Sequence, residues 1–352
     1  MIKNEKRVVI LGAGFAGISA KLYYPKSILI DSSDKFFLTP RSIDLIEGKE
    51  TISSVLIPRK VDVLAEVRSI DFRNKRVITS AGDIKYDKLI ISLGFSQDLV
   101  KIRGAEKYAL KYESIYDVLN LKERLKSSKR VVIIGGGALG VELAGVIGKS
   151  REKEVYIIEA ESRLLPVFNE ELSNYATKLL EEKYGVNIFT KTIIDEIRED
   201  EVITSNGKIR AEVIIFAAGF AGNNIISKLG LSNKKNRILV DRTLRSIDYE
   251  DIFAAGDCAV FKDGFIPQSA QIALQAGEIA MRNALGEEIE FNPKQRAIVF
   301  RVGDEYFGLF QGKFIKGFIA RVLKTIALSL VEGKIRRLNE LEEKSSRLLA
   351  VV

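Results

Sequence analysis

The chain carries one hydrophobic pattern twice. The segments KRVVILGAGFAG (residues 6–17) and KRVVIIGGGALG (residues 129–140) both begin with an uninterrupted apolar run rich in β-branched residues. Such a run is typical of a strand that is buried on both faces of a parallel sheet. Glycines follow in each copy, and then a stretch suited to a helix, ISAKLYY in the first and VELAGVIG in the second. The pattern therefore predicts an α/β protein with two strand–turn–helix units.

The glycines of each copy have the spacing G-x-G-x-x-G. They are Gly12, Gly14 and Gly17 in the first copy and Gly135, Gly137 and Gly140 in the second. The first glycine permits a tight turn, the second lets a pyrophosphate approach the backbone, and the third lets the helix pack closely on the strand. The N-terminus of the helix offers free N–H groups and a partial positive charge to the phosphates. Each copy therefore predicts a dinucleotide site.

An acidic residue ends the next strand in both copies. The run SILI leads to Asp31, and EVYIIE ends in Glu159. A carboxylate at this position accepts hydrogen bonds from ribose hydroxyls. A carboxylate also repels a 2′-phosphate, so Glu159 favours NADH over NADPH. Arg163, four residues further on, leaves NADPH as an alternative. Two dinucleotides in one chain suggest electron transfer between a tightly held flavin and a diffusible nicotinamide.

The repeat is larger than the glycine pattern. The apolar strands YDKLIISLG and AEVIIFAAG end in Gly94 and Gly219, and each follows a short β-rich stretch. Each half of the chain therefore has the elements of a whole nucleotide-binding unit with a β-meander insert. The strand DIFAAGDCA has no counterpart in the other half, and it places Gly256 and Asp257 where a carboxylate can hold a sugar-alcohol chain.

Composition removes several kinds of chemistry. The 352 residues include one cysteine, Cys258, and no histidine. A redox-active cysteine pair, a multi-cysteine metal centre and any mechanism with a histidine base are therefore excluded. We expect no metal site. The formal charge of +8 suits an acidic partner, but the chain has no nucleic-acid recognition motif.

Residues 5–285 resemble the flavoproteins with two dinucleotide-binding domains, the pyridine nucleotide–disulfide oxidoreductase superfamily. The resemblance implies two Rossmann-like domains, the second inserted in the first. It places FAD in the domain of residues 1–108 and 245–300, and NAD(P)H in that of residues 109–244. Residues 301–352 would form a C-terminal interface or membrane-association segment. Val67 matches the position whose backbone meets the adenine.

The cofactor-binding residues expected from the motifs and the resemblance lie around both sites. They are Gly12, Gly14, Phe15, Ala16, Gly17, Asp31, Ser32, Pro40, Arg41, Val67, Ser92, Gly94, Gly135, Gly137, Ala138, Leu139, Gly140, Glu159, Ala218, Gly219, Gly256, Asp257 and Ala270.

The superfamily's catalytic cysteine pair is missing, so disulfide and sulfide chemistry are not expected. The segment SAQIALQAG (residues 269–277) resembles the quinone-site motif A-Q-x-A-x-Q of type II NADH dehydrogenases. Gln271 and Gln275 are four residues apart and share one helix face. A polar helix face near FAD, without quinone, is the alternative. Glu142 is the candidate proton relay to the quinone, or else a group that only positions the nicotinamide.

The resemblance thus implies an FAD-dependent enzyme that takes a hydride from NADH and passes two electrons to a membrane quinone. One alternative is a reductase of a ferredoxin- or rubredoxin-type carrier protein, which a basic surface could bind. Another is a flavoprotein that binds NAD(H) as a sensor with little turnover.

The C-terminal segment KFIKGFIARVLKTIALSL (residues 313–330) has apolar residues at helical spacing. They are Phe314, Ile315, Phe318, Ile319, Val322, Leu323, Ile326 and Leu330, and Lys313, Lys316, Arg321 and Lys324 lie off this stripe. The pattern predicts a basic amphipathic helix that binds an anionic membrane surface, at the cytoplasmic side of the cell membrane. The alternative is a soluble cytoplasmic protein whose helix packs on its own domain or in a homodimer.

Overall fold

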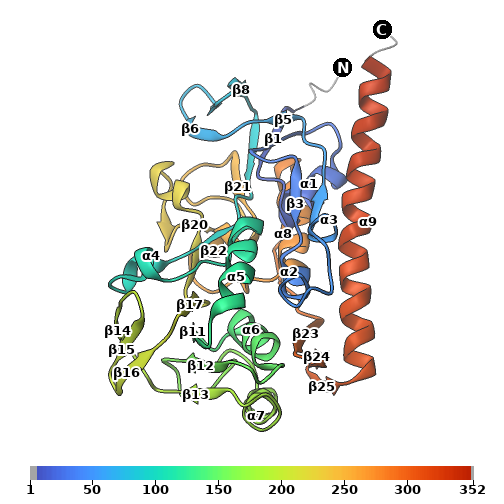
Figure 1. Cartoon of the computed structure of the whole chain (residues 1–352). Coiled ribbons are helices and arrows are strands. Elements are labelled where there is room, and N and C mark those ends of the chain that lie inside the picture. The colour runs from blue at the N-terminus through green and yellow to red at the C-terminus, as the bar shows by residue number, and fades with distance from the viewer. Residues whose placement is uncertain (1–5, 350–352) are drawn as a thin grey trace, which may run out of the picture.

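The computed structural model describes residues 6–349, without the side chains of residues 342 and 344–349. A five-stranded parallel sheet forms the centre of the first domain, in the order β21-β9-β1-β2-β5 (Figure 1). Its strands are β1 (Val8–Leu11), β2 (Ile28–Asp31), β5 (Val63–Leu64), β9 (Lys88–Ile91) and β21 (Ile252–Ala254). All four residues of β1 are buried, as the uninterrupted apolar run predicts.

A four-stranded parallel sheet forms the centre of the second domain, in the order β13-β12-β11-β17. Its strands are β11 (Arg130–Ile134), β12 (Glu154–Ile158), β13 (Asn187–Phe189) and β17 (Val213–Phe216). A three-stranded antiparallel meander accompanies each sheet. The meanders are β6 (Val67–Asp71), β7 (Arg76–Thr79) and β8 (Gly82–Lys85), and β14 (Ile194–Ile197), β15 (Glu201–Thr204) and β16 (Gly207–Arg210). The predicted α/β class with two nucleotide-binding units is therefore confirmed.

Helices α1 (Phe15–Tyr23) and α6 (Ala138–Gly148) follow the two glycine turns. Helix α8 (Ala270–Ala284) packs directly on α1, and a Cβ on Gly277 would lie 2.0 Å from the carbonyl oxygen of Ala16. The backbones of α1 and α8 therefore touch at this glycine. The other α-helices of these domains are α2 (Thr39–Ile46), α3 (Ile52–Val55), α4 (Ala105–Tyr108), α5 (Ile115–Ser127) and α7 (Glu170–Lys178). Strands β3 (Lys35–Phe37) and β4 (Leu56–Pro58), which flank α2 and α3 in the chain, pair as an antiparallel ribbon.

The two passages of the chain between the domains form a two-stranded antiparallel ribbon. Its strands are β10 (Phe95–Gln97) and β18 (Phe220–Gly222). The rings of Phe95 and Phe220 meet edge to face, with centroids 4.8 Å apart. The buried Gln97 amide donates to the carbonyl of Phe216 (2.5 Å) and accepts from the N–H of Tyr112 (2.7 Å). The ribbon is thereby fixed to the second domain.

The chain returns to the first domain earlier than predicted. Strand β20 (Arg237–Val240) pairs with β19 (Asn233–Lys234) and with β22 (Ala259–Phe261). Ile238 and Val240 belong to the apolar core of the first domain. The segment after β18 thus pairs and packs with the first domain ahead of the boundary predicted at residues 244/245.

A three-stranded antiparallel sheet precedes the C-terminal helix. Its strands are β23 (Ala297–Val302), β24 (Glu305–Phe310) and β25 (Lys313–Lys316). The prediction of a helix from residue 313 was wrong for this first part. Gln311 and Gly312 both have positive φ (49° and 79°), the geometry of a tight hairpin turn, so residues 313–316 return as a strand.

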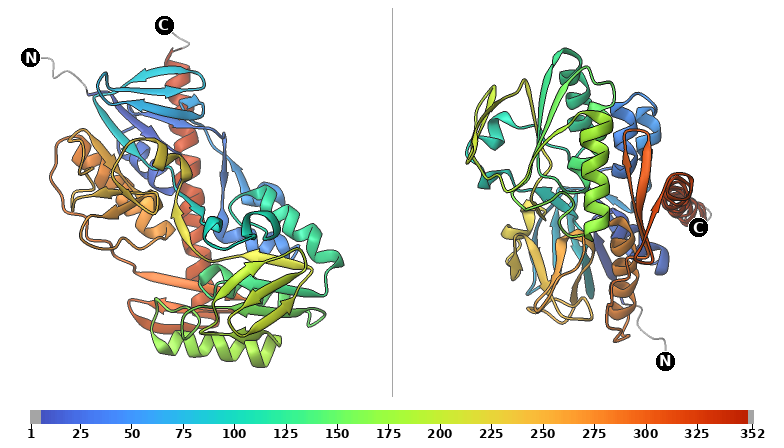
Figure 2. Two further views of the ribbon diagram at one scale, coloured as in Figure 1. Left: turned by 90° about the vertical axis from the view of Figure 1, so that its left-hand side faces the viewer. Right: turned by 90° about the horizontal axis from the view of Figure 1, so that it is seen from below.

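Helix α9 (Phe318–Leu349) stands along one side of the molecule (Figures 1 and 2). Its inward face consists of Ala320, Lys324, Val331, Ile335 and Leu338, all buried. Much of the predicted apolar stripe faces outward instead: the exposed fractions are 80% for Phe318, 62% for Ile319, 36% for Val322, 49% for Ile326 and 64% for Leu330. The protein's own packing therefore leaves this stripe uncovered.

Candidate functional site

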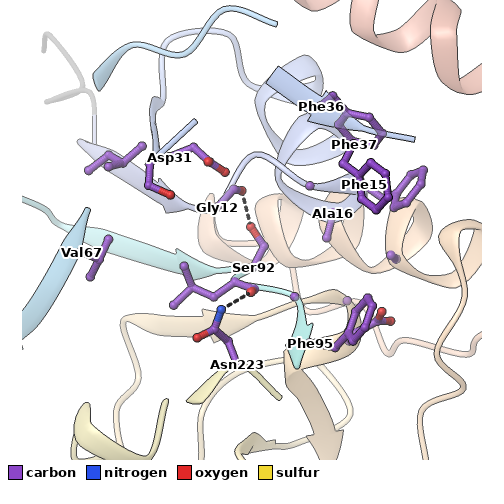
Figure 3. Close-up of a pocket in the computed structure, with 18 of the residues that line it drawn as sticks. Gly12, Phe15, Ala16, Asp31, Phe36, Phe37, Val67, Ser92, Phe95 and Asn223 are labelled. Atoms are coloured by element: carbon purple, nitrogen blue, oxygen red, sulfur yellow. Dashed lines mark hydrogen bonds between the residues drawn. The ribbon is translucent and has the colours of Figure 1, made fainter. Parts of the chain in front are cut away.

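A cavity of about 490 Å³ lies at the carboxyl ends of the first domain's strands, beside the start of α1 (Figure 3). It has the size of a small-molecule site. Eleven of the predicted cofactor-binding residues line it: Gly12, Gly14, Phe15, Ala16, Asp31, Ser32, Val67, Ser92, Gly94, Gly256 and Asp257. The structure thus gathers residues from the N-terminal fingerprint, the middle of the chain and the late Gly-Asp pair around one space.

Asp31 connects the turn of the fingerprint to an arginine that the sequence did not reveal. The carboxylate accepts hydrogen bonds from the N–H groups of Ala13 (2.6 Å) and Ser33 (2.9 Å). Its Oδ1 also lies 2.7 Å from Nη2 of Arg59, which lines the cavity and is 7% exposed. Burial lowers the pKa of Arg59, which the charge of Asp31 partly offsets. Among the described residues, Nε of Arg59 has no hydrogen-bond partner.

The second copy reproduces the Asp31 arrangement without an arginine. Glu159 accepts from the N–H groups of Gly136 (2.6 Å) and Glu161 (2.8 Å), and its carboxylate is largely buried. Ala218 lies against the turn, because a Cβ on Gly135 would meet it at 2.8 Å. Arg163 donates to the backbone carbonyl of Pro166 (3.2 Å), so its guanidinium is bonded within its own loop.

Some predicted residues support the turns rather than line a cavity. A Cβ on Gly17 would lie 1.9 Å from the carbonyl oxygen of Gly12, and one on Gly140 would lie 1.9 Å from that of Gly135. These two glycines therefore allow helix and strand to approach, as their position in the fingerprint predicts. Arg41 does not line this cavity, and its Nη1 forms an ion pair with Glu332 of α9 (2.5 Å).

A second cavity of about 450 Å³ adjoins the first, and its walls are mainly apolar. Phe15, Phe95 and Asp257 line both spaces. Its other predicted residues are Pro40, Ala138, Leu139, Glu142, Ala270 and Gln271. Strand β23 and helix α9 form another part of the wall, with Ala297, Ile298, Val299, Phe300, Leu323, Lys324, Ala327, Leu328, Leu330 and Val331. The cavity thus brings together both domains and the C-terminal segment.

Glu142 is paired inside the second cavity. Its Oε1 lies 2.5 Å from Nζ of Lys324 and accepts the main-chain N–H of Arg301 (2.7 Å). The helical pattern had placed Lys324 on an outward basic face. The side chain is instead only 9% exposed and points into the protein. The sequence shows no link between residues 142 and 324, because only the fold brings α6 and α9 together.

The two glutamines of the A-Q-x-A-x-Q motif differ in their surroundings. Gln275 donates to the carbonyls of Gln271 (3.1 Å) and Lys294 (3.0 Å) and accepts the N–H of Lys294 (3.2 Å). It does not line the second cavity. Gln271 accepts the N–H of Arg296 (2.6 Å) and does line the cavity. Both side chains therefore secure the segment that leads from α8 to β23, and only Gln271 also faces the cavity.

Asp257 lies partly buried at the junction of the two cavities. Burial raises the pKa of its carboxyl group to about 6, although the nearby charge of Arg237 acts in the opposite direction. The Arg237 guanidinium donates to the backbone carbonyls of Asp257 (3.0 Å), Ala259 (2.6 Å) and Ile266 (2.8 Å). It thereby holds the loop that presents Asp257.

Replacement of Asp257 by asparagine should stabilise the protein without cofactor near neutral pH. The carboxyl's pKa is about 6 in the folded state and about 3.9 in the unfolded chain, so folding binds a proton more tightly and its stability falls as pH rises between these values. Removing the charge should raise the free energy of unfolding at pH 7 by about 3 kcal/mol. Urea titrations at pH 4 and pH 7 test this, since the gain should vanish at pH 4. An equal gain at both pH values would contradict it.

Cys258, adjacent to Asp257, is fully buried, and its Sγ lies 3.3 Å from the carbonyl oxygen of Ile91. Burial raises the pKa of this thiol to about 11. A thiol that stays protonated at neutral pH is a poor nucleophile. This agrees with the expectation that the chain does not perform disulfide or sulfide chemistry.

Residues 6–277 match the family described as pyridine nucleotide-disulphide oxidoreductase. The match covers more than half of the chain, which therefore belongs to this family. A type II NADH:quinone oxidoreductase of Staphylococcus saprophyticus is 30% identical over 95% of this chain and 98% of its own length. The enzyme of the same name from Staphylococcus aureus is 28% identical over the same shares. The prediction of an oxidoreductase in this family is confirmed.

Solved structures have the same fold. NDH2 from Plasmodium falciparum, in complex with NADH, has a TM-score of 0.82 over 98% of both chains at 18% identity. The sulfide:quinone oxidoreductase from Aquifex aeolicus has a TM-score of 0.81 over 99% of this chain and 95% of its own, at 19% identity. These similarities extend through the C-terminal segment. Within residues 6–349, no helix has both the length and the apolar character needed to cross a membrane.

Proposed function

We propose that the protein binds FAD in the first cavity, binds NADH at the second fingerprint, and reduces a quinone in the second cavity. The observation that carries this proposal is that the two cavities adjoin and share Phe15, Phe95 and Asp257. A planar group bound at this junction would contact both cavities. The named function of the Staphylococcus relatives agrees with this assignment.

The first cavity fits FAD at both ends. At one end, Asp31 can accept hydrogen bonds from ribose hydroxyls, and the orphaned Nε of Arg59 leaves one buried donor for a ligand. Between the ends, Gly14 has open space where a Cβ would be, so a pyrophosphate can approach the start of α1. At the other end, the partly buried carboxylate of Asp257 can accept hydrogen bonds from the sugar-alcohol chain of FAD. When bound, FAD would supply a two-electron carrier between NADH and the second substrate.

The second cavity fits an aromatic quinone head group. Its apolar residues exclude water, while Gln271 and the Glu142–Lys324 pair offer polar atoms to the carbonyl oxygens. Reduction of a quinone to a quinol consumes two electrons and two protons. Nζ of Lys324 can donate a hydrogen bond to the oxygen that gains charge, and Glu142 can pass a proton toward it. In a chain without histidine, this pair is our candidate for proton delivery.

An anaerobic two-step experiment tests the function. The flavin-loaded protein is mixed with one equivalent of NADH and then with a short-chain quinone, while the flavin absorption band is followed. Rapid bleaching and rapid recovery with quinone are expected. Recovery only with a ferredoxin-type carrier would favour a carrier-protein reductase. No bleaching by NADH would contradict hydride delivery from the second fingerprint.

We also propose that α9 binds the membrane surface through its uncovered stripe. Leu330 is both exposed and part of the second cavity's lining, so the stripe reaches the cavity that we assign to the quinone. A quinone dissolved in a bilayer would then reach the cavity from that side. Transfer of exposed apolar side chains from water into the interfacial region of a bilayer is favourable, so it would stabilise the bound state.

The double variant Phe318→Glu/Leu330→Glu should bind anionic liposomes at least tenfold more weakly than the unchanged protein. It places charge on the stripe at two residues that the fold leaves exposed, so the unfolding transition should not move. Cosedimentation with liposomes measures the binding. A matched control is Val100→Glu/Val167→Glu, which changes two exposed apolar residues far from α9 in sequence. Equal binding by both double variants would remove α9 as the attachment site.

A further inference from the structure

We infer that Arg301 is a positioning residue for quinone reduction. It holds Glu142 and the β23 wall of the second cavity in a fixed position relative to helix α2. This inference rests on the proposed function. Arg301 lies in β23 and does not line the second cavity itself. Its effect would therefore reach the substrate through its neighbours.

The Arg301 guanidinium lies between two acids of the first domain. Nη1 bonds to Oδ1 of Asp44 in α2, and Nη2 bonds to Oε2 of Glu47, which directly follows that helix. The arginine side chain is 3% exposed. A planar guanidinium with a separate acid on each nitrogen has little freedom to rotate, so strand β23 is fixed relative to α2.

The main chain of Arg301 acts on the candidate proton relay. Its N–H donates to the same Oε1 of Glu142 that Lys324 approaches. The three residues before it, from Ile298 to Phe300, form part of the cavity wall, and so do Thr39, Pro40 and Ile43 of α2. A shift of Arg301 would therefore move two walls relative to each other and release one bond to Glu142.

A network of charges extends from Arg301 to the far end of α6. Lys149 follows α6 and lies 2.6 Å from Glu47 and 2.7 Å from Asp304. Lys49 lies 2.8 Å from Glu47 and 3.1 Å from Asp304. With Asp44 and Arg301 the network has three acids and three cations, so it is balanced in charge. It connects the first domain, the helix that carries Glu142, and the hairpin between β23 and β24.

Stability alone is a weak reason for burying an arginine here. Well-packed apolar residues can replace a buried ion pair at little or no cost in stability, whereas an ion network imposes one geometry. The substitution Arg301→Lys separates these two roles, stability and positioning. It keeps the positive charge but cannot bridge Asp44 and Glu47 with a rigid fork.

The test measures the two half-reactions separately in the flavin-loaded full-length protein. In Arg301→Lys, reduction of the flavin by NADH should stay within about twofold of the unchanged protein. Reoxidation by saturating short-chain quinone should be about tenfold slower, with the same KM for NADH. Asp44→Asn, which leaves Glu47 as the single carboxylate bonded to the arginine, should slow reoxidation by about threefold. Asp44→Asn also serves as the second variant if Arg301→Lys does not fold.

The control is Lys126→Gln, which removes an exposed ion pair with Glu123 (2.6 Å) and should leave both half-reactions unchanged. Unchanged quinone rates in Arg301→Lys and Asp44→Asn would overturn the inference. A parallel fall of both half-reactions, or loss of flavin, would also overturn it, because it would indicate a general structural role. If the unchanged protein reduces no quinone, the proposed function fails before Arg301 is tested.

Discussion

Glu142→Gln should lower quinone reduction by about a hundredfold while NADH still bleaches the flavin at close to the original rate. A positioned proton donor or acceptor contributes about 10²–10⁴-fold to a rate, and glutamine cannot carry a proton in this way. Glutamine has nearly the same shape, and its amide oxygen can still accept the N–H of Arg301. Stopped-flow measurement of the two half-reactions separates the proton step from hydride transfer.

Glu123→Gln is the matched control, since Glu123 is exposed and paired only with Lys126 among the described residues. It should leave both rates unchanged. If Glu142→Gln slows flavin reduction and leaves reoxidation intact, Glu142 positions the nicotinamide instead of delivering protons. That result would decide between the two roles that the sequence left open.

Asp31→Ala should yield a protein without tightly bound flavin, whose free energy of unfolding is about 3–5 kcal/mol lower. The substitution leaves the buried Arg59 without its carboxylate partner, and an uncompensated buried charge costs about this much. It also removes the acceptor of the Ala13 and Ser33 N–H groups. Flavin content after purification and a urea titration measure the two effects.

Glu159→Ala is the comparison that the duplicated fold offers. Glu159 accepts two N–H groups in the same way, but no cation pairs with it among residues 6–341. Its removal should cost about 1–2 kcal/mol, keep the flavin and raise the KM for NADH at least tenfold. A yellow, stable Asp31→Ala protein would contradict the placement of FAD in the first cavity. Equal stability losses in the two variants would contradict the role of Arg59.

The local part of both sites followed from the sequence because it depends on short spacings. The strand, the three glycines and the acid all lie between Val8 and Asp31, and the structure closes them into one hydrogen-bonded unit. The meanders were predictable for the same reason. Local residues also determine the early part of the C-terminal segment, but the turn at Gln311 and Gly312 outweighed the helical spacing of the apolar residues after it.

Long-range partners could not be predicted. Arg59, Lys324 and Arg301 carry no local sign of their role, since each meets its partner only after folding, and Lys324 lies 182 positions from Glu142. The pairing of the segment before the predicted domain boundary is long-range in the same way. Strand β20 has no feature that shows whether it will pair with the second sheet or with β22. Pairing across the fold is a property of the assembled core, which one sequence does not reveal.

The ribbon of β10 and β18 has a consequence for the timing of turnover. A single flexible linker lets one domain rotate about it, and relative motion is the default where the contact is small. Here both passages of the chain are hydrogen-bonded to each other over three residue pairs, and Gln97 fastens them to the second domain. A rotation of one domain against the other would have to disturb this pairing. We therefore expect NADH to bind without a swing of the second domain about a single linker.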